Sequence, residues 1–547
     1  MLGKRFSRRA IWMIAGSLAC GMALHVISTG AQQQTSGEVR KTAIRKPKLR
    51  PDVARFAARV DSMLREEHAA KAVWGIVVVD HSTGETLYER NADSFFTPAS
   101  NTKLYTTAFG LATLGPDYHY RTTVESAAVP DPGGRVRGDV VLVGRGDPDL
   151  SNRKFPFEQK AERDGPAEKV LAELADAIVA KGVKQIDGDI IADDSYFAYD
   201  PYPEGWSTGD LFFGFGAPVS AIDLDDNTLQ VSVVPGEHPG DPAAVAIEPW
   251  AGYDLFGHDL TTGPSASKQQ FAVVREPGAN PILLRGSIPL GAQPAKLELA
   301  LDEPAELTAH LLKLLLESRG VVISGAAKAH HAPPPERAPD GSTALVPAPP
   351  MPPLIQDPVV LAEHASPPLI ESIRLLNKVS QNLHAELLLR TIAKEKSGIG
   401  TTDAGIALET DFVKSIGIAD GDVVLADGSG LSRQNLVTPR ATATLLEFAA
   451  RQSWGDAYIS TLPVAAEDGT LEDRMKGTAA AGRIHAKTGS VEHVRSISGY
   501  ATSVRGAQLV FSIFMNNNPQ PPRDTGHIFD AICAAMVEEI QPRPRHK

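Results

Sequence analysis

The stretch at residues 97–103, Thr-Pro-Ala-Ser-Asn-Thr-Lys, places a hydroxyl and an amine where a helix begins, and it constrains the fold more than any other part of the chain. Pro98 is excluded from a helix interior, so the helix is predicted to open with Ser100 in its first turn. Residues three apart on a helix share a face, so the Ser100 hydroxyl and the Lys103 amine can meet as a nucleophile and its base. The helix then continues along an apolar run at helical spacing, namely Leu104, Ala108, Leu111 and Leu114.

The same Ser-x-x-Lys spacing recurs at Ser151/Lys154 and at Ser265/Lys268. A solvated surface pair is the plainer interpretation of such a match, so spacing alone does not identify a reactive pair. The context that selects Ser100 must come from motifs elsewhere in the chain.

A second short motif, Ser380-x-Asn382, lies between helical patterns at residues 369–376 and 383–392. Two interpretations stay open for it. Either it forms a loop that faces a cleft, or it is a helix–helix turn in which Asn382 serves as a cap.

A third motif, Lys487-Thr488-Gly489, comes just before two strand patterns at residues 496–502 and 508–515. A short turn separates these strands, which predicts a β-hairpin. The motif is therefore expected on or beside the edge of an antiparallel sheet. Like the second motif, it occurs once in the chain.

In this order, Ser-x-x-Lys, Ser-x-Asn and Lys-Thr-Gly form the three-motif signature of penicillin-recognising serine enzymes. Lys103 and Ser380 are separated by 277 positions (380 − 103), far more than a class A β-lactamase offers. From about residue 50 to 540 the chain resembles the D-alanyl-D-alanine carboxypeptidase/endopeptidases of the class C low-molecular-mass penicillin-binding proteins. Four further segments carry this resemblance, at residues 144–148, 192–197, 216–221 and 427–432.

The resemblance implies an α/β (α+β) fold, with a transpeptidase/β-lactamase-like catalytic domain whose antiparallel sheet is flanked by helices. Two β-rich domains would be inserted between the first and second motifs. The predicted boundaries are residues 52–117 and 359–547 for the split catalytic domain, 118–210 and 290–329 for inserted domain II, 211–289 for the nested domain III, and 330–358 for a proline-rich linker.

Chemistry and resemblance together give each motif residue a role. A serine hydroxyl is a weak nucleophile at neutral pH, so Ser100 needs Lys103 as its base. Lys103 can serve only if its pKa is lowered, and desolvation together with a second ammonium, Lys487, favours this. By resemblance, Ser380 relays a proton to the leaving amine, and Asn382 orients Lys103 and the substrate amide.

The resemblance also implies how the substrate is held. Lys487 and Thr488 would bind its terminal carboxylate, with Gly489 in the same substrate-binding strand. The backbone N–H groups of Ser100 and Ser490 would form an oxyanion hole.

Substrate choice is expected to lie in the inserted region. By resemblance, Asp193 would project toward the cleft and receive the free amino end of a diaminopimelate-type side chain. The neighbouring Asp194 is the alternative, because the two residues differ by one position in register.

Residues 1–31 have the pattern of an export signal, with four basic residues, then an apolar stretch, then small residues up to Ala31. An uncleaved membrane anchor is the alternative, and the arginine pair also permits twin-arginine export. Residues 32–51 are predicted to be a flexible lead-in. We expect an exported protein of the periplasm or cell envelope, without a membrane span once the signal is removed.

Removal of residues 1–31 would take away four positive charges and no negative ones, changing the formal charge from −12 to −16 (−12 − 4). Nucleic acid and anionic membrane surfaces are bound by basic faces, so an acidic protein of this kind is not expected to bind them.

Cysteine and histidine give no metal or cofactor signal. Cys20 lies in the predicted export signal, which leaves Cys533 alone in an apolar helical run, where a packed core thiol is expected. His330 and His331 lie beside the proline-rich linker and are expected to be solvated. We therefore expect no metal and no cofactor.

The function that follows is a serine-type D-Ala-D-Ala carboxypeptidase, a DD-endopeptidase, or both. It would act on peptidoglycan stem peptides through a Ser100 acyl-enzyme, and β-lactam antibiotics would be its covalent inhibitors. Two alternatives are a β-lactamase-like hydrolase and a catalytically inactive peptidoglycan-binding envelope protein. The paired Ser100 and Lys103 argue against the second alternative, because a binding protein does not need them.

Overall fold

The computed structural model describes residues 49–159, 161–249, 256–274, 282–334, 336–337, 345–346, 351–520 and 522–543. The predicted export signal, nearly all of the lead-in and part of the proline-rich linker lie outside the described residues. None of the helices in the described part is long and apolar enough to cross a membrane.

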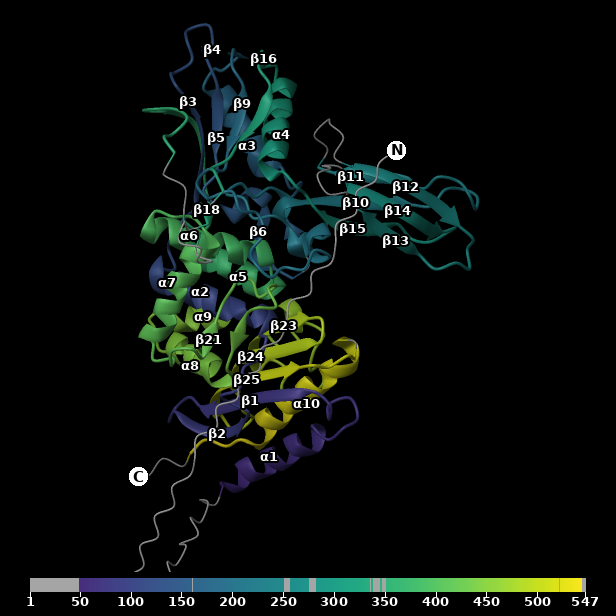
Figure 1. Ribbon diagram of the computed structural model, residues 1–547, viewed down its shortest axis with the longest axis vertical. Coiled ribbons are helices and arrows are strands. Elements are labelled where there is room, and N and C mark those ends of the chain that lie inside the picture. The colour runs from purple at the N-terminus through teal and green to yellow at the C-terminus, as the bar shows by residue number, and fades with distance from the viewer. Residues whose placement is uncertain are drawn as a thin grey trace, which may run out of the picture. The chain divides into compact units, whose positions relative to one another are not determined.

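A five-stranded antiparallel sheet joins the two ends of the described chain (Figure 1). Its strand order is β2-β1-β25-β24-β23, and β1 pairs with β25 from Val73↔Asn516 to Asp80↔Leu509. The strands are β1 (Val73–Asp80), β2 (Glu85–Arg90), β23 (Ile484–Val491), β24 (Val494–Thr502) and β25 (Gln508–Asn516).

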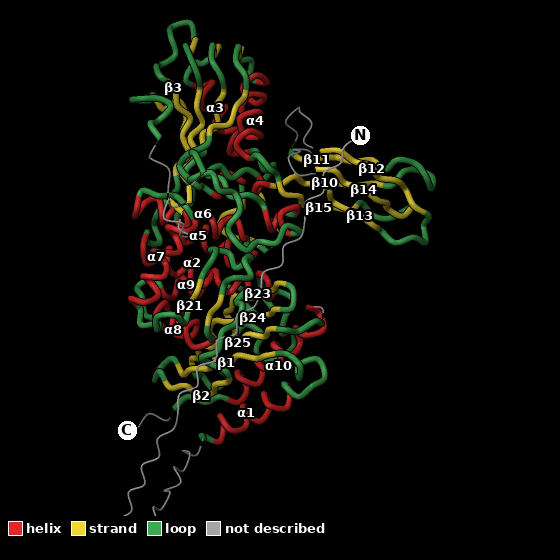
Figure 2. Tube along the Cα trace, in the orientation of Figure 1, coloured by secondary structure: helices red, strands yellow, loops and turns green. Residues whose placement is uncertain are grey.

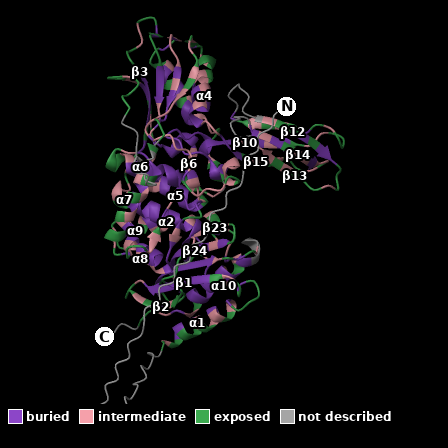
Figure 3. Cartoon of the chain, viewed as in Figure 1, coloured by how far each residue is buried: buried purple, intermediate pink, exposed green. Residues whose placement is uncertain are grey.

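The strand β1 is buried on both faces because its apolar residues alternate between two cores. Trp74, Ile76 and Val78 pack into one hydrophobic cluster, while Val77 and Val79 pack into another on the opposite face. Figure 3 shows this sheet buried along most of its length. A sheet covered on both faces is the arrangement predicted for the catalytic domain.

Helices cover both faces of this sheet. On one face lie α1 (Pro51–Met63) and α10 (Pro522–Glu539), and Cys533 of α10 is a buried free thiol in that core, as expected. On the other face the core is formed largely by helices near the three motifs. The elements of this side are α2 (Thr102–Thr113), α5 (Leu369–Val379), α6 (Asn382–Ser397), α7 (Thr402–Ser415), α8 (Pro439–Ala450), α9 (Gly455–Thr461), β21 (Val423–Val424) and β22 (Leu436–Val437). The 3-10 turn η1 (Ala99–Asn101) precedes α2, and the 3-10 turn η6 (Gly469–Leu471) contributes Leu471 to the first core.

The chain between α2 and α5 forms separate sheets. A five-stranded mixed sheet has the order β17-β9-β5-β3-β20, and a smaller parallel sheet has the order β16-β8-β4. Their elements are β3 (Arg121–Ser126), β4 (Arg135–Val136), β5 (Val140–Val143), β8 (Gln185–Ile186), β9 (Ile190–Asp193), β16 (Val322–Ile323), β17 (Ala327–His330) and β20 (Val359–Ala365), with helices α3 (Lys169–Ala180) and α4 (Pro304–Ser318).

Residues 228–300 add two three-stranded sheets, whose described residues form strands without helices (Figure 2). The sheets are β11-β10-β15 and β12-β14-β13. Their strands are β10 (Thr228–Val234), β11 (Ala244–Glu248), β12 (Phe256–Gly263), β13 (Gln270–Val274), β14 (Ile282–Pro289) and β15 (Ala295–Ala300).

Short elements complete the segment between the motifs. They are the hairpin β6 (Arg153–Glu158) and β7 (Ala161–Arg163), the pair β18 (Glu336–Arg337) and β19 (Leu345–Val346), and the 3-10 turns η2 (Pro148–Ser151), η3 (Asp210–Phe212), η4 (Gly214–Gly216) and η5 (Asp225–Asn227).

The strand β20 concerns the predicted boundary at residue 359, where the catalytic domain is expected to resume. Its residues fall in the range 359–547 that the sequence analysis gives to the catalytic domain, but they pair with β3 and complete the sheet of the inserted segment. The pairing is non-local, so no pattern within residues 359–365 indicates it. The other domain boundaries stay predictions.

Candidate active site

Ser100 lies in the 3-10 turn η1, which opens α2 as predicted. The preceding residue, Ala99, has a φ of 50°, a left-handed conformation that is costly for a residue with a Cβ. Two hydrogen bonds hold this turn against the sheet. Ser496 Oγ donates to the Pro98 carbonyl at 2.7 Å, and Asn101 Nδ2 donates to the Lys487 carbonyl at 3.0 Å.

Lys103 is fully buried and joins the first two motifs. Its Nζ lies 2.9 Å from Ser100 Oγ, 2.6 Å from Asn382 Oδ1 and 2.6 Å from the Ser429 carbonyl. Burial lowers the Lys103 pKa to about 7, although the carboxylates of Asp427 and Glu386 oppose the change. A large fraction of this amine is therefore uncharged at neutral pH and able to accept a proton.

Ser380 and Asn382 connect α5 to α6, so the second motif lies between two helices as predicted. Ser380 takes a left-handed φ of 66° at the end of α5. Gln381, and not Asn382, caps the next helix, because its side chain accepts a hydrogen bond from the Leu383 N–H at 2.8 Å. The Asn382 side chain is left to bind Lys103 and to donate to the Phe215 carbonyl at 2.7 Å.

Lys487 lies on β23, the edge strand of the catalytic sheet, as predicted. Its Nζ donates to Ser380 Oγ and to the Thr488 carbonyl, both at 2.8 Å. Burial holds the pKa of this amine well below its usual value, and the Lys103 ammonium lowers it further. The Thr488 hydroxyl is 2.7 Å from the Thr470 hydroxyl.

Gly489 allows the edge strand to approach the nucleophile turn. A Cβ at this position would lie 2.2 Å from Ser496 Oγ, 2.7 Å from the Pro98 carbonyl and 3.0 Å from the Ser100 nitrogen. No side chain fits there without moving backbone. The next residue, Ser490, is exposed and opposite Arg495 in the strand register.

The other two Ser-x-x-Lys pairs have unrelated surroundings. Ser151 Oγ donates to Asp223 at 2.6 Å, whereas Lys154 binds Glu158 at 2.8 Å. Ser265 and Lys268 are both exposed. Of the three matches, the structure thus brings only Ser100 and Lys103 together with the second and third motifs.

Asp193 lies at the end of β9, in the sheet of the inserted segment. Its Oδ1 accepts from the Ser195 N–H at 2.9 Å and lies 3.0 Å from His330 Nδ1. Asp194 similarly binds His331 Nδ1 at 2.8 Å. The side-chain partners of these two aspartates among the described residues lie outside the three motifs. His330 and His331 are partly buried and hydrogen bonded to them, which corrects the expectation that they are solvated.

The loop at residues 427–432 is a part of the site for which the sequence analysis predicts no role. Glu386 accepts hydrogen bonds from the N–H groups of Gly428 and Ser429, and this holds the Ser429 carbonyl against Lys103. Burial raises the Glu386 pKa to about 7. One sequence signal was available, because Glu386 lies four residues after Asn382 and shares its helix face.

A serine hydroxyl beside a buried amine of lowered pKa, with a second buried amine on the edge strand, is suited to acyl transfer through a covalent serine intermediate. Fold and site together define a penicillin-recognising serine enzyme. Residues 56–536 match the model of the D-Ala-D-Ala carboxypeptidase 3 (S13) family, and the chain belongs to this family. The prediction of a serine-type D-Ala-D-Ala carboxypeptidase is confirmed at the level of the family.

Individual relatives agree with the family assignment. The chain is 36% identical over 490 residues to the D-alanyl-D-alanine carboxypeptidase of Actinomadura sp. (strain R39), covering 88% of this chain and 84% of that protein. It is 26% identical over 450 residues to the D-alanyl-D-alanine carboxypeptidase DacB of Haemophilus influenzae, covering 81% and 85%.

A solved structure supports the fold. The crystal structure of penicillin binding protein 4 from Haemophilus influenzae superimposes with a TM-score of 0.71 at 22% identity, covering 88% of this chain and 99% of that chain. The predicted fold class, a transpeptidase/β-lactamase-like domain with inserted β-rich segments, is thereby confirmed.

Proposed function

We propose that this chain hydrolyses the terminal D-Ala-D-Ala bond, or a DD cross-link, of peptidoglycan stem peptides through an acyl-enzyme on Ser100. The main observation is the hydrogen bond between Lys103 Nζ and Ser100 Oγ at 2.9 Å. Lys103 is buried, and burial lowers its pKa to about 7. This pairing supplies the base that a serine nucleophile requires.

Acylation begins when the uncharged Lys103 amine takes the Ser100 proton and Oγ attacks the carbonyl carbon of the scissile amide. The negative charge on the carbonyl oxygen is received by the N–H groups of Ser100 and Ser490, a contribution typically worth about 3–4 kcal/mol per donor. Collapse of the intermediate breaks the C–N bond. Ser380 then gives its proton to the leaving amine and takes up the proton that Lys103 received from Ser100, which leaves Lys103 uncharged again. Lys487 keeps Ser380 Oγ in place through its hydrogen bond at 2.8 Å.

Deacylation repeats these steps with water. Lys103 takes a proton from a water molecule and the hydroxide attacks the ester carbonyl; the C–O bond to Ser100 then breaks as Lys103 gives that proton to Ser100 Oγ. Asn382 accepts a hydrogen bond from Lys103 throughout, which fixes the amine beside the reacting oxygen.

Substrate binding is assigned to the edge strand. Lys487, Thr488 and Gly489 would hold the terminal carboxylate of the leaving residue. Asp193 stays our candidate for the amino end of a diaminopimelate-type side chain, which requires that its present hydrogen bond to His330 be exchanged for the substrate amine.

The relevant compartment is the periplasm or cell envelope, where peptidoglycan lies. β-Lactams would acylate Ser100, because their ring amide occupies the place of the D-Ala-D-Ala bond. Nucleic acid is not among the proposed partners.

The test is the intact mass of the purified protein before and after incubation with benzylpenicillin, with S100A as the matched control. A stable adduct mapped to Ser100 and absent from S100A is the expected result. Assays on muropeptides with a free D-Ala-D-Ala terminus and on cross-linked muropeptides then separate carboxypeptidase from endopeptidase activity. Rapid turnover of penicillin without an adduct would favour a β-lactamase-like hydrolase, and a folded protein with neither adduct nor turnover would overturn the proposal.

A further inference from the structure

A strained turn lies close to the catalytic helix α6. Asp225, Asp226 and Asn227 of η5 have successive φ values of 53°, 53° and 55°, although none of them is glycine. Such a run is unfavourable for residues with a Cβ and persists only where its surroundings hold it.

Three hydrogen bonds hold this turn in place. Ser151 Oγ accepts from the Asp226 N–H at 2.8 Å, Asn227 Nδ2 donates to the Pro218 carbonyl at 2.9 Å, and the Thr228 hydroxyl donates to the Asp225 carbonyl at 2.7 Å. The backbone conformation is therefore fixed independently of α6, and it determines where the Asp226 carboxylate points.

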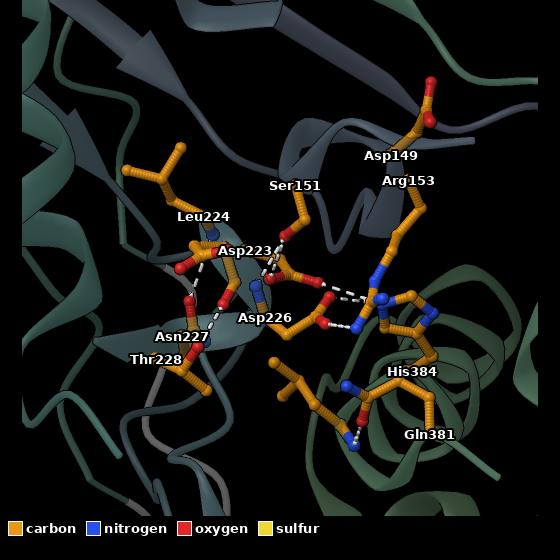
Figure 4. A network of polar contacts seen from close by, with 12 residues as sticks. Asp149, Ser151, Arg153, Asp223, Leu224, Asp226, Asn227, Thr228, Gln381 and His384 are labelled. Atoms are coloured by element: carbon orange, nitrogen blue, oxygen red, sulfur yellow. Dashed lines mark hydrogen bonds and ion pairs between the residues drawn. The ribbon is translucent and has the colours of Figure 1, made fainter. Parts of the chain in front are cut away.

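Figure 4 shows that Asp226 faces His384 of α6. Asp226 Oδ1 lies 3.1 Å from His384 Nε2, and both side chains are almost completely buried. The other carboxylate oxygen is paired with the guanidinium groups of Arg153 and Arg163. A buried hydrogen bond thus joins the inserted segment to the helix that carries the second motif.

His384 lies close in sequence to Asn382 of the second motif, so its contact with Asp226 bears on the active site. His384 is two residues after Asn382, in the first turn of α6, and Asn382 is itself bound to the inserted segment through the Phe215 carbonyl. The inserted segment therefore holds the first turn of α6 at two points. A shift of that turn would move Asn382 Oδ1 away from Lys103 Nζ, from which it is now 2.6 Å.

We infer that His384 and Asp226 are positioning residues for acyl transfer: their hydrogen bond fixes the start of α6 and so keeps Asn382 on Lys103. This inference rests on the proposed function, because it concerns the rate at which Ser100 is acylated.

Charges around the pair are balanced by protein groups. Burial would raise the Asp226 pKa, but Arg153, His384 and Arg163 outweigh it and hold the pKa well below its usual range. The neighbouring Asp223 accepts a hydrogen bond from Ser151 and lies 3.5 Å from His384 Nε2, and burial together with the Asp226 charge raises its pKa well above the usual value. Ligand atoms of Asp223, Asp226 and His384 lie within 4.8 Å of one another, a spacing that suits a metal ion. Arg153 and Arg163 supply positive charge to the same carboxylate, so the cluster is accounted for as an ion-pair network.

The experiment measures acylation by a chromogenic β-lactam in stopped flow, which separates the rate at saturation from the half-saturating concentration. The variants are H384A, H384Q, D226N and the double variant H384A/D226N. We expect H384A to lower the saturating rate about 10- to 100-fold, the size of effect that a small misplacement of a catalytic group produces, with the half-saturating concentration within about twofold of wild type.

Gln can still donate from its amide, so H384Q is expected to recover most of the lost rate. D226N should show an intermediate loss. The double variant should be no slower than H384A, because both substitutions act through one hydrogen bond.

The matched control is H364A. His364 Nε2 pairs with Asp149 at 3.1 Å in the same inserted segment, and its second acidic neighbour, Asp147 at 3.7 Å, also lies outside α6. We expect its saturating rate to equal that of wild type.

Each outcome is decisive. A folded H384A or D226N variant that is acylated at the wild-type rate overturns the inference, and so does an equal loss in H364A, which would indicate a general packing effect. If H384A does not fold, H384Q and D226N decide, since both preserve side-chain size. Failure of the wild-type protein to acylate at Ser100 would instead overturn the proposed function.

Discussion

At the scale of single residues, the site depends on taking charged groups out of water. Lys103 and Lys487 are both fully buried. Lys103 donates to a serine, an asparagine and a carbonyl oxygen, and Lys487 donates to a serine and a carbonyl oxygen. Burial penalises the charged form of an amine, so the protein obtains a base at neutral pH from a residue that is otherwise protonated.

The Lys103 pKa leads to a prediction for pH dependence. Only the uncharged amine accepts the Ser100 proton, so the acylation rate should rise with pH through about 7 and level off above it, where Lys103 is deprotonated. The measurement is the saturating acylation rate across this range, with K103R as a control that keeps its proton and should not react. A rate that falls as pH rises through neutrality would contradict the assignment of Lys103 as base.

Gly489 gives a second prediction at this scale. In G489A the new methyl group would collide with Ser496 Oγ and the Pro98 carbonyl, which pushes β23 away from the nucleophile turn. Acylation should fall at least about tenfold, since small displacements of reacting groups have large effects on rate. Stopped-flow acylation checks this, with G209A as the control.

Gly209 suits that control because a Cβ there has its nearest neighbour, Ser207 Oγ, at 4.0 Å. Equal rates in G489A and wild type would show that the close approach of β23 to the nucleophile turn is not needed for the reaction.

At the scale of elements, the loop at residues 427–432 couples helix α6 to the nucleophile. Asp427 accepts hydrogen bonds from the Gly430 N–H at 2.8 Å, the Ser432 N–H at 2.6 Å and Trp206 Nε1 at 2.9 Å. Gly430 has a φ of 85°, and a Cβ there would lie 1.9 Å from the Ala99 carbonyl. The loop is thus folded around one carboxylate and packed against the turn that holds Ser100.

Removing that carboxylate should destabilise the loop. In D427A several buried donors lose their acceptor, and each unsatisfied buried group costs about 1–3 kcal/mol. We expect a lower thermal midpoint together with a slower acylation rate, measured by differential scanning calorimetry and stopped flow. D427N retains an acceptor oxygen and should lie between D427A and wild type; a D427A protein as stable as wild type would show that water replaces these contacts.

At the scale of the whole molecule, residues from distant parts of the chain complete one site. The ends of the described chain meet in the catalytic sheet through the pairing of β1 and β25. The inserted segment contributes contacts to the catalytic loops, because Trp206 binds Asp427, Asp210 binds Arg433, and the Phe215 carbonyl binds Asn382.

Strand β25 lies at the centre of this five-stranded sheet, so its core residues are expected to stabilise the whole molecule. Ile513 of β25 is fully buried and lies opposite Ile76 and Ile497 in the register. I513A should lower the free energy of unfolding by about 2–5 kcal/mol, as for other large-to-small core substitutions. Denaturant unfolding measures this, with L314A as a control, since Leu314 is 42% exposed and its loss should change stability by no more than about 0.5 kcal/mol. Equal effects of the two substitutions would contradict the central role of β25.

Much of the fold and site could be predicted because their signals are local. The helix after Ser100, the two helices around Ser380 and the hairpin after Lys487 each follow from spacing and turn residues within a short window. The pairing of β20 with β3 and the ion pairs of His330 and His331 could not be predicted, since both depend on partners more than a hundred positions away.

Local patterns in the chain specify a serine and a lysine three apart at a helix start, a serine and an asparagine between helices, and a lysine on an edge strand. Tertiary packing selects which of the three Ser-x-x-Lys pairs is buried beside the other motifs, and it brings the loop at residues 427–432 onto Lys103. The physical reason is that periodicity is a local property, whereas burial, lowered amine pKa values and hydrogen bonds such as that between Lys103 and Asn382, 279 positions apart, arise when distant segments pack together.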